Sequence, residues 1–294
     1  MKMKNLILLL ASSLALFNTS SSAQSRSEFE HNHEDDTVMF ERAREQQNEY
    51  FREMQENIVN GVPMDIDSGT CKYASAIFTA PPSKTVVLTF DDGPNSTLTI
   101  ELLAILKKYD IKATFFMKGN QAKANPDVVA AVKAAGHLIA NHSWDHPNFH
   151  ELPPGTQASE VTAVDDLLGS LMAPFKLFRY PYGNSTCATN VLVKKTLGYA
   201  GIVGWHVDSC DWAFSKTGTV TPKQARICEV KPQNTSNFVG HVLSEIRRHN
   251  GGIVLMHEVR ERTVANVEEI IRQLLKEGFQ FTNLDDPKMK KYLF

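Results

Sequence analysis

Short apolar runs and amphipathic stretches alternate along the chain from residue 84 onward. The apolar runs predict strands at residues 85–90, 113–117, 137–140, 177–180, 200–206, 252–257 and 279–282. The stretches between them predict helices at residues 99–109, 126–135, 160–171, 190–197, 238–249 and 264–277. Strands that alternate with helices in this way indicate a parallel α/β fold.

The first 23 residues have the pattern of a signal peptide. Lys2 and Lys4 precede an apolar run at residues 6–17, and residues 21–23 are the small side chains that a signal peptidase recognises. The run is too short to span a bilayer permanently, and an uncleaved N-terminal anchor is the alternative. We therefore expect export to the periplasm or the cell exterior, with no stable membrane span after cleavage.

Residues 24–83 are a polar, acidic lead-in before the α/β domain that we expect at residues 84–294. Four apolar residues of the lead-in are spaced to lie along a helix that packs on the main domain: Phe40, Phe51, Met54 and Ile58. A second polar stretch, residues 213–237, contains Pro and Gly and is predicted to be a loop.

Charge and cysteine content narrow the picture further. The chain has 31 basic and 33 acidic residues without a basic stripe, so we expect no nucleic-acid partner. Four cysteines in an exported protein suggest two disulfides, and four cysteines allow three pairings. Closeness in the sequence favours a bond between Cys210 and Cys228, and the pairing of Cys71 and Cys187 stays open. A metal site made of cysteines is the alternative, although the sequence has no CxxC pair.

Polar side chains collect where the predicted strands end. Asp91 and Asp92 follow the first strand directly. Further candidates at or just after later strands are His142, His146, Arg179, Asp208, Asp211 and His257. In a closed (β/α) barrel the carboxyl ends of the strands meet at one rim, which is where active sites are built. This convergence, more than any single residue, predicts a functional site.

A metal site is the first chemistry that these residues suggest. On a helical turn, His142 and His146 would have their Cβ atoms about 5–6 Å apart. Two imidazoles and one carboxylate form a zinc-type site with a position open for water. Asp91 or Asp92 would be the third ligand, because adjacent carboxylates repel each other unless a cation lies beside them. We expect one divalent cation, with zinc favoured and cobalt, nickel or manganese left open.

Five short motifs, in order, resemble the signatures of the polysaccharide deacetylases, the family with the NodB homology domain (carbohydrate esterase family 4). They are Thr89–Pro94 (TFDDGP), His142–His146 (HSWDH), Arg179–Gly183 (RYPYG), Asp208–Trp212 (DSCDW) and Leu255–His257 (LMH). The resemblance implies a distorted, incomplete (β/α) barrel of about seven parallel strands. It also implies hydrolysis of N-acetyl groups. Residues 213–237 are longer than we expect for this family.

The resemblance assigns roles around the metal. Asp92, His142 and His146 would be the metal ligands. Asp91 would be the general base that activates the attacking water, and Arg179 would pair with Asp91 and favour its charged form.

It also assigns roles to residues around the acetyl group. The backbone N–H of Tyr182 would help to bind the oxyanion. Asp211 would orient His257, the general acid that protonates the departing amine. The acetyl pocket would be walled by Trp212, Leu255 and Pro181.

The substrate expected from the resemblance is a polysaccharide that contains N-acetylglucosamine. Peptidoglycan comes first, because an exported catalytic domain meets a cell wall. Chitin oligomers, a biofilm polymer of N-acetylglucosamine and O-acetylated xylan are alternatives. Two hypotheses from other functional classes remain. The protein could be a metal-containing carbohydrate-binding protein without turnover, or its metal could be purely structural.

Overall fold

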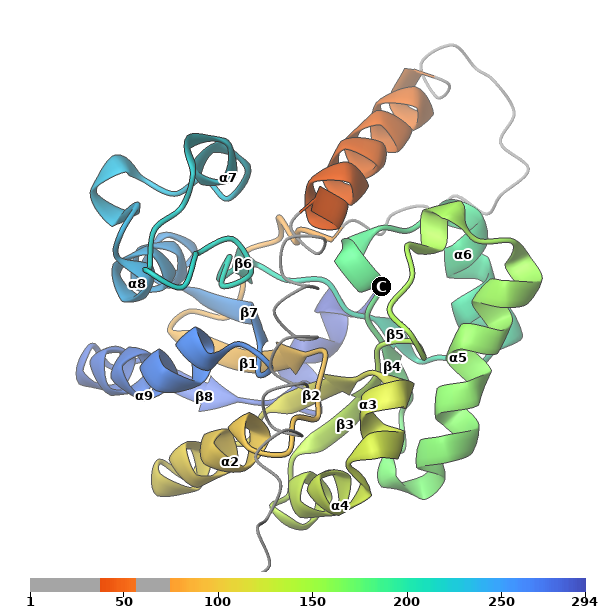
Figure 1. The fold of residues 1–294 in the computed structure, drawn as a ribbon, viewed down its shortest axis with the longest axis horizontal. Helices are drawn as coiled ribbons and strands as arrows, with labels where there is room; N and C mark the ends of the chain where they lie inside the picture. Colours follow the sequence, from red (N-terminus) through yellow and green to blue (C-terminus); the bar gives the residue numbers. More distant parts are fainter. Residues whose placement is uncertain (1–37, 57–74) are drawn as a thin grey trace, which may run out of the picture.

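The computed structural model describes residues 38–56 and 75–294 of the 294-residue chain. Its centre is one curled sheet of parallel strands, with helices packed around it (Figure 1). The strands are β1 (Thr85–Asp91), β2 (Thr114–Met117), β3 (Leu138–Asn141), β4 (Leu177–Phe178), β5 (Gly201–Ile202), β6 (Val207–Asp208), β7 (Gly251–His257) and β8 (Gln280–Thr282). They follow the order β5-β4-β3-β2-β1-β7-β6, and β8 pairs with the first residues of β1. This arrangement confirms the expected incomplete barrel.

The helices lie close to their expected positions. They are α2 (Leu98–Lys108), α3 (Gly119–Ala124), α4 (Pro126–Ala134), α5 (Pro154–Leu168), α6 (Cys187–Val191), α7 (Pro222–Ile227), α8 (Phe238–His249) and α9 (Glu261–Lys276). α5 begins earlier than predicted, at a proline, which suits the first turn of a helix. A π-helical turn, Leu192–Thr196, continues α6. The short helix α3 was not expected, because its sequence, GNQAKA, has almost no apolar periodicity.

Strand β1 explains how the rim residues are aimed. Leu88 and Phe90 belong to the large apolar cluster shared with the helices, whereas Val87 belongs to a second cluster. Because successive side chains of a strand point to opposite faces, Thr89 and Asp91 share the face of Val87. Every residue from the second position of β1 onward is buried. The strand therefore delivers Asp91 to the end of that face.

The expectation of one strand at residues 200–206 is wrong. β5 pairs with β4 and β6 pairs with β7, at opposite ends of the sheet order. Residues 203–206 therefore carry the chain between the two edges. Backbone oxygens of Val203 and Gly204 accept hydrogen bonds from Arg179 in this crossing. A crossing segment cannot pair as one strand, although its apolar side chains give it the pattern of one.

The polar stretch at residues 213–237 is more ordered than the predicted loop. It contains α7 and a 3-10 turn, Pro232–Asn234. α7 begins with a capping box at Thr221, whose side chain and that of Gln224 bond each other's backbone N–H. The disulfide between Cys210 and Cys228 ties this stretch to the rim and confirms the favoured pairing. Cys187 is also disulfide-bonded, and Cys71 lies outside the described residues.

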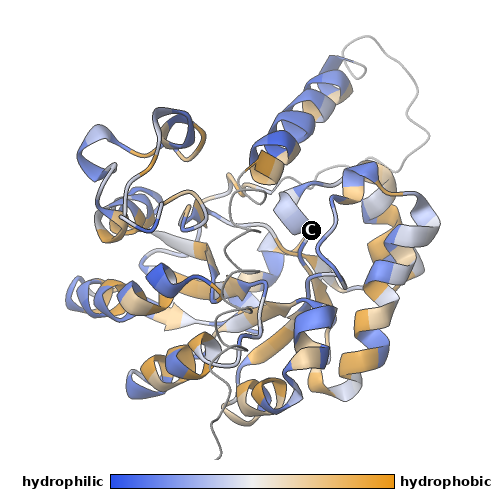
Figure 2. Ribbon diagram, viewed as in Figure 1, coloured by the Kyte–Doolittle hydropathy of each residue, from blue (hydrophilic) through white to orange (hydrophobic). Residues whose placement is uncertain are grey.

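A helix covers residues 38–56 and touches the barrel near the carboxyl ends of its strands (Figure 1). Ala43, Gln47 and Met54 are its buried residues, and their spacing places them on one face. The remaining surface is mostly hydrophilic (Figure 2). The expected helix is therefore present over the described residues, while Ile58 and the predicted signal peptide lie outside them.

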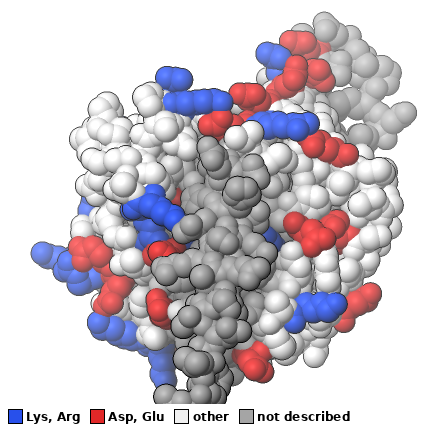
Figure 3. Space-filling model, in the orientation of Figure 1, with Lys and Arg blue, Asp and Glu red and all other residues white. Residues whose placement is uncertain are grey.

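Surface properties add two observations. None of the helices in the described parts of the chain combines the length and hydropathy of a membrane span. On the face shown in Figure 3, acidic and basic side chains are interspersed, so that no single-sign field covers it.

Candidate active site

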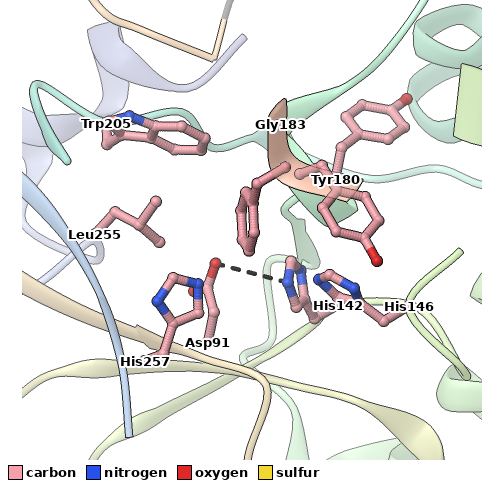
Figure 4. A pocket seen from close by; sticks show the side chains of 10 residues that line it. Asp91, His142, His146, Tyr180, Gly183, Trp205, Leu255 and His257 are labelled. Carbon is pink, nitrogen blue, oxygen red and sulfur yellow. Dashed lines mark ion pairs between the residues drawn. The ribbon is translucent and has the colours of Figure 1, made fainter. Parts of the chain in front are cut away.

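Four of the rim residues predicted from the sequence line one pocket at the carboxyl ends of the strands: Asp91, His142, His146 and His257 (Figure 4). Asp91 ends β1, His257 ends β7, and His142 follows β3 directly. The residues that line the pocket are Phe40, Asp91, His142, His146, Tyr180, Tyr182, Gly183, Trp205, Leu255 and His257. The segments that contribute them are far apart in the sequence, so the sheet itself assembles the site.

Asp91 and Asp92 serve the same site although they are neighbours. Asp91 Oδ2 and Asp92 Oδ1 each lie 3.6 Å from Nε2 of His142. Side chains of neighbouring strand residues normally diverge, but Asp92 has a φ of 77°, which ends the strand and turns its carboxylate back. A left-handed conformation is strained for a residue other than glycine, and strain of this kind is concentrated at functional sites.

Asp92, His142 and His146 form a set that could hold a metal ion. One ligand atom from each residue lies within 4.8 Å of the other two. Nε2 of His146 is 3.3 Å from Asp92 Oδ1. The expectation that both histidines lie on a helical turn is wrong, because Ser143 and His146 have φ values of 68° and 65° in an irregular loop. The loop nevertheless brings the two rings to 4.9 Å between centroids.

The chemistry of this donor set fits a divalent cation. Asp92 Oδ1 is buried without a hydrogen-bond partner, which is costly unless something else satisfies it. Nδ1 of His142 lies 2.8 Å from the backbone oxygen of Arg179. A carbonyl can only accept, so Nδ1 carries the proton and Nε2 is left as a ligand.

The protonation of the three residues fits as well. Burial lowers the pKa of both histidines, that of His146 strongly, so their rings are neutral near pH 7. Burial would raise the pKa of Asp92, but His146, in the protonated form that it takes at acidic pH, and Lys118 outweigh burial and keep the pKa below its usual value, so the carboxylate is ionised near pH 7. Neutral imidazoles and an ionised carboxylate are the forms that bind metals.

Arg179 anchors Asp91. Its guanidinium is fully buried and donates to Asp91 Oδ1 at 2.7 Å and to Thr89 Oγ1 at 2.8 Å. Nε and Nη2 donate to backbone oxygens of the crossing segment, residues 203–206. The arginine thus ties the end of β4 to β1 and to the crossing segment, and it fixes one oxygen of the carboxylate, while the other faces His142.

His257 is held by Asp211. Nδ1 of His257 lies 2.6 Å from Asp211 Oδ1, and its backbone N–H donates to Asp211 Oδ2 at 2.7 Å. Thr263 donates a further bond to Oδ2. Burial lowers the pKa of His257, but the charge of Asp211 and its hydrogen bond outweigh burial, and the pKa is raised to about 9. The ring is therefore protonated near neutral pH.

A tight turn at Pro181–Gly183 forms another wall. Tyr182 has a φ of 57° there, and its ring centroid lies 4.5 Å from that of His146. Gly183 is required by its surroundings, because a Cβ atom at that position would lie 2.5 Å from the ring of Trp205. The turn therefore presents its backbone and the Tyr182 ring at the edge of the pocket.

The three expected wall residues are placed differently. Leu255 lines the pocket, Pro181 is buried in the turn, and Trp212 stacks on Phe40 with ring centroids 4.6 Å apart. Four lining residues were not predicted from the sequence: Phe40, Tyr180, Gly183 and Trp205. Tyr180 was within reach, since it adjoins Arg179 in the third motif. No sequence motif indicated Phe40 or Trp205. Phe40 belongs to the predicted lead-in helix, and Trp205 belongs to the segment predicted to be a strand.

Comparison with known proteins agrees with this geometry. The sequence profile of the polysaccharide deacetylase family matches residues 79–202. A peptidoglycan-N-acetylglucosamine deacetylase of Bacillus cereus is 33% identical over 230 residues, covering 77% of this chain and 79% of that protein. The crystallised chitin deacetylase of the fungal pathogen Colletotrichum lindemuthianum is 27% identical, with a TM-score of 0.58 over 72% of this chain and 91% of that one.

A longer relative gives the same result over a smaller share of its length. A peptidoglycan-N-acetylglucosamine deacetylase of Listeria monocytogenes is 32% identical over 214 residues, which cover 70% of this chain but only 39% of that protein. Fold, site geometry and the match to relatives of similar length therefore agree: the chain belongs to the polysaccharide deacetylase family.

Proposed function

We propose that this protein hydrolyses N-acetyl groups of N-acetylglucosamine residues in a polysaccharide, with peptidoglycan as the first candidate. The observation that carries the proposal is the placement of two acid–base groups around one ligand set. Asp91 lies beside His142, and Nε2 of His257 is 4.0 Å from Asp92 Oδ2. Amide hydrolysis needs a base for the water and an acid for the amine, both near the reacting carbon.

Asp92, His142 and His146 would hold one divalent cation, and zinc suits this nitrogen and oxygen set, with cobalt, nickel or manganese as alternatives. When bound, the cation polarises the acetyl carbonyl and makes the attacking water more acidic.

Asp91 is the proposed general base. Its Oδ1 is occupied by the guanidinium of Arg179, which leaves Oδ2 to take the proton of the attacking water. The buried Arg179 thereby orients the carboxylate and stabilises its negative charge. Replacing the carboxylate by an amide of the same shape would remove this step.

His257 is the proposed general acid. Asp211 engages Nδ1, so Nε2 is the atom that faces the site and gives its proton to the leaving amine. A pKa near 9 keeps the ring protonated at neutral pH, as an acid requires. The backbone N–H of Tyr182, at the strained turn, is the proposed donor to the developing oxyanion.

Relatives named as peptidoglycan-N-acetylglucosamine deacetylases support peptidoglycan as the substrate. The similarity to a chitin deacetylase supports N-acetylglucosamine as the sugar unit of that substrate. An exported location is consistent with the disulfide between Cys210 and Cys228, and the signal peptide at residues 1–23 belongs to the same proposal. Chitin oligomers, a biofilm polymer of N-acetylglucosamine and O-acetylated xylan are the other polymers to compare.

Acetate release tests the proposal. The purified protein is incubated with peptidoglycan, chitin oligomers and acetylated xylan, after chelation and after zinc is returned. We expect acetate from an N-acetylglucosamine polymer only when the metal is present. Sugar binding without acetate, under every ion tried, would instead indicate a carbohydrate-binding protein. Collapse of the fold on chelation, without any acetate before it, would indicate a structural metal.

A further inference from the structure

The 38–56 helix lies across the mouth of the site. Its Phe40 ring stacks on Trp212 at 4.6 Å and meets the rings of Tyr182 and His257 edge-on, at 5.0 and 5.9 Å. Phe40 also lines the pocket that contains Asp91. One side chain of the helix thus contacts both the proposed general acid and the turn that carries the proposed oxyanion donor.

Polar contacts fasten the helix on both sides of the rim. On one side Arg44 donates to the backbone oxygen of Ile227 at 2.8 Å, and Glu41 pairs with Lys223 of α7. Further contacts lie on the other side. They are Gln46 with Asn148, Glu151 and Asn184, Gln47 with Ser185, and Tyr50 with Cys187. The helix therefore bridges the opening that a substrate has to cross.

The residues of the proposed chemistry are closed off in this arrangement. Asp91, Asp92, His142, His146 and His257 are each less than one-tenth exposed. A polysaccharide is an extended chain, and it cannot lay an acetamido group against these atoms while the ring of Phe40 fills the space between Trp212 and Tyr182. Access thus requires the helix to move.

The way the helix is held allows such movement. Ala43 and Met54 are its buried apolar residues, and most other contacts are side-chain hydrogen bonds, which range from the exposed bond of Gln46 with Glu151 to the buried bond of Gln47 with Ser185. Bonds of this kind exchange for bonds to water at small net cost. A segment with few buried apolar contacts belongs to the part of a structure that opens most readily.

We propose that residues 38–56 form a cap that closes the active site, with Phe40 in the place of the substrate's acetamido group, so that lifting the helix admits the polysaccharide. This proposal rests on the proposed function, because the polysaccharide that the helix would exclude is the substrate proposed there. Phe40 is in this account a gate and takes no part in the chemistry.

Two variants of matched size separate the gate from the rest of the helix. Phe40→Ala removes the ring from the pocket. Phe51→Ala removes the same ring farther along the helix, where its aromatic contact is Tyr50. Aromatic pairs contribute enough to favour the closed state about tenfold. We therefore expect Phe40→Ala to raise kcat/KM on N-acetylglucosamine oligomers about tenfold, and Phe51→Ala to stay within about twofold of the parent protein.

A second pair of variants tests the cap through the Glu41–Lys223 ion pair, in case Phe40→Ala folds poorly. Lys223→Glu opposes Glu41 and should loosen the helix without touching the pocket, raising the rate. Glu41→Lys combined with Lys223→Glu restores the pair and should return the rate to that of the parent. The melting temperature of each variant checks that the barrel is intact.

Zinc exchange gives a readout that does not need turnover. The full-length protein is loaded with zinc, and the rate of its loss to an excess of EDTA is followed. We expect Phe40→Ala to lose zinc about tenfold faster than the parent and Phe51→Ala to match the parent. Unchanged zinc loss in Phe40→Ala, or a fall in kcat/KM, would overturn the cap and make Phe40 a wall that the substrate needs. Faster zinc loss with no acetate from any variant would uphold the cap and reject the deacetylase proposal.

Discussion

Asp211 binds His257 twice, through the ring at 2.6 Å and through the backbone N–H at 2.7 Å. The same carboxylate therefore sets both the position of the imidazole and its charge. Burial raises the pKa of Asp211, but the charge of His257 and the hydrogen bonds outweigh burial and lower it. The pair is an ion pair near neutral pH, which is the form in which the proposed general acid can protonate a leaving amine.

Replacing Asp211 by asparagine should shift the pH dependence of activity. Without the carboxylate, burial is left to lower the pKa of His257, so the ring loses its proton at a lower pH. In the parent protein the acid form is lost as the pH rises through about 9. We expect the alkaline limb of the kcat/KM profile to move toward neutral pH in Asp211→Asn. At pH 7 and above, kcat/KM should fall about 10²-fold. An unmoved alkaline limb would remove His257 as the acid.

Asp91→Asn should separate metal binding from turnover. The ligand atoms of Asp92, His142 and His146 are untouched, so we expect one zinc per chain by atomic absorption. The base is lost, so acetate release should fall about 10²–10⁴-fold. A variant with normal turnover would exclude Asp91 as the base, and a variant without zinc would show that Asp91 is a ligand.

His142→Ala should release the ion. It removes one of two imidazoles and leaves too few ligands for a stable site. His150→Ala is the matched control, because His150 lies near the rim but outside the ligand set. We expect zinc to be lost in dialysis from the first variant and kept by the second. Full occupancy in His142→Ala would defeat the ligand assignment.

The disulfide between Cys210 and Cys228 closes a stretch with a sequence separation of 18 residues next to Asp211. Loop-closure entropy predicts that it stabilises the folded state by about 3 kcal/mol. Replacing both cysteines by serine should lower the free energy of unfolding in urea by about that amount. An unchanged free energy of unfolding would mean that the reduced chain is already restrained there.

Much of the site could be predicted from the order of strands and motifs. Asp91 and His257 end strands that pair in register, so their proximity follows from the parallel sheet. The local geometry could not be predicted, because it depends on backbone conformations that the pattern does not carry. Asp92, Ser143 and His146 take left-handed conformations that no spacing rule indicates.

Contacts between segments that are far apart in the sequence also could not be predicted. Residues 200–206 have the apolar pattern of a strand, yet their role is to cross between two sheet edges. Phe40 has the spacing of a packing residue on a helix, and nothing in the sequence says that its partner surface is the pocket. Both features depend on where distant segments meet.

Mass spectrometry of peptidoglycan sugars tests the central claim most directly. Purified wall is incubated with the zinc-loaded protein or with Asp91→Asn, and the digested disaccharides are weighed. We predict that the parent protein produces disaccharides lighter by one acetyl group and that Asp91→Asn produces almost none. The same measurement is made on chitin and on poly-N-acetylglucosamine, with each divalent ion in turn. If the parent protein leaves every acetyl group on all three polymers, the result contradicts the proposed deacetylase activity.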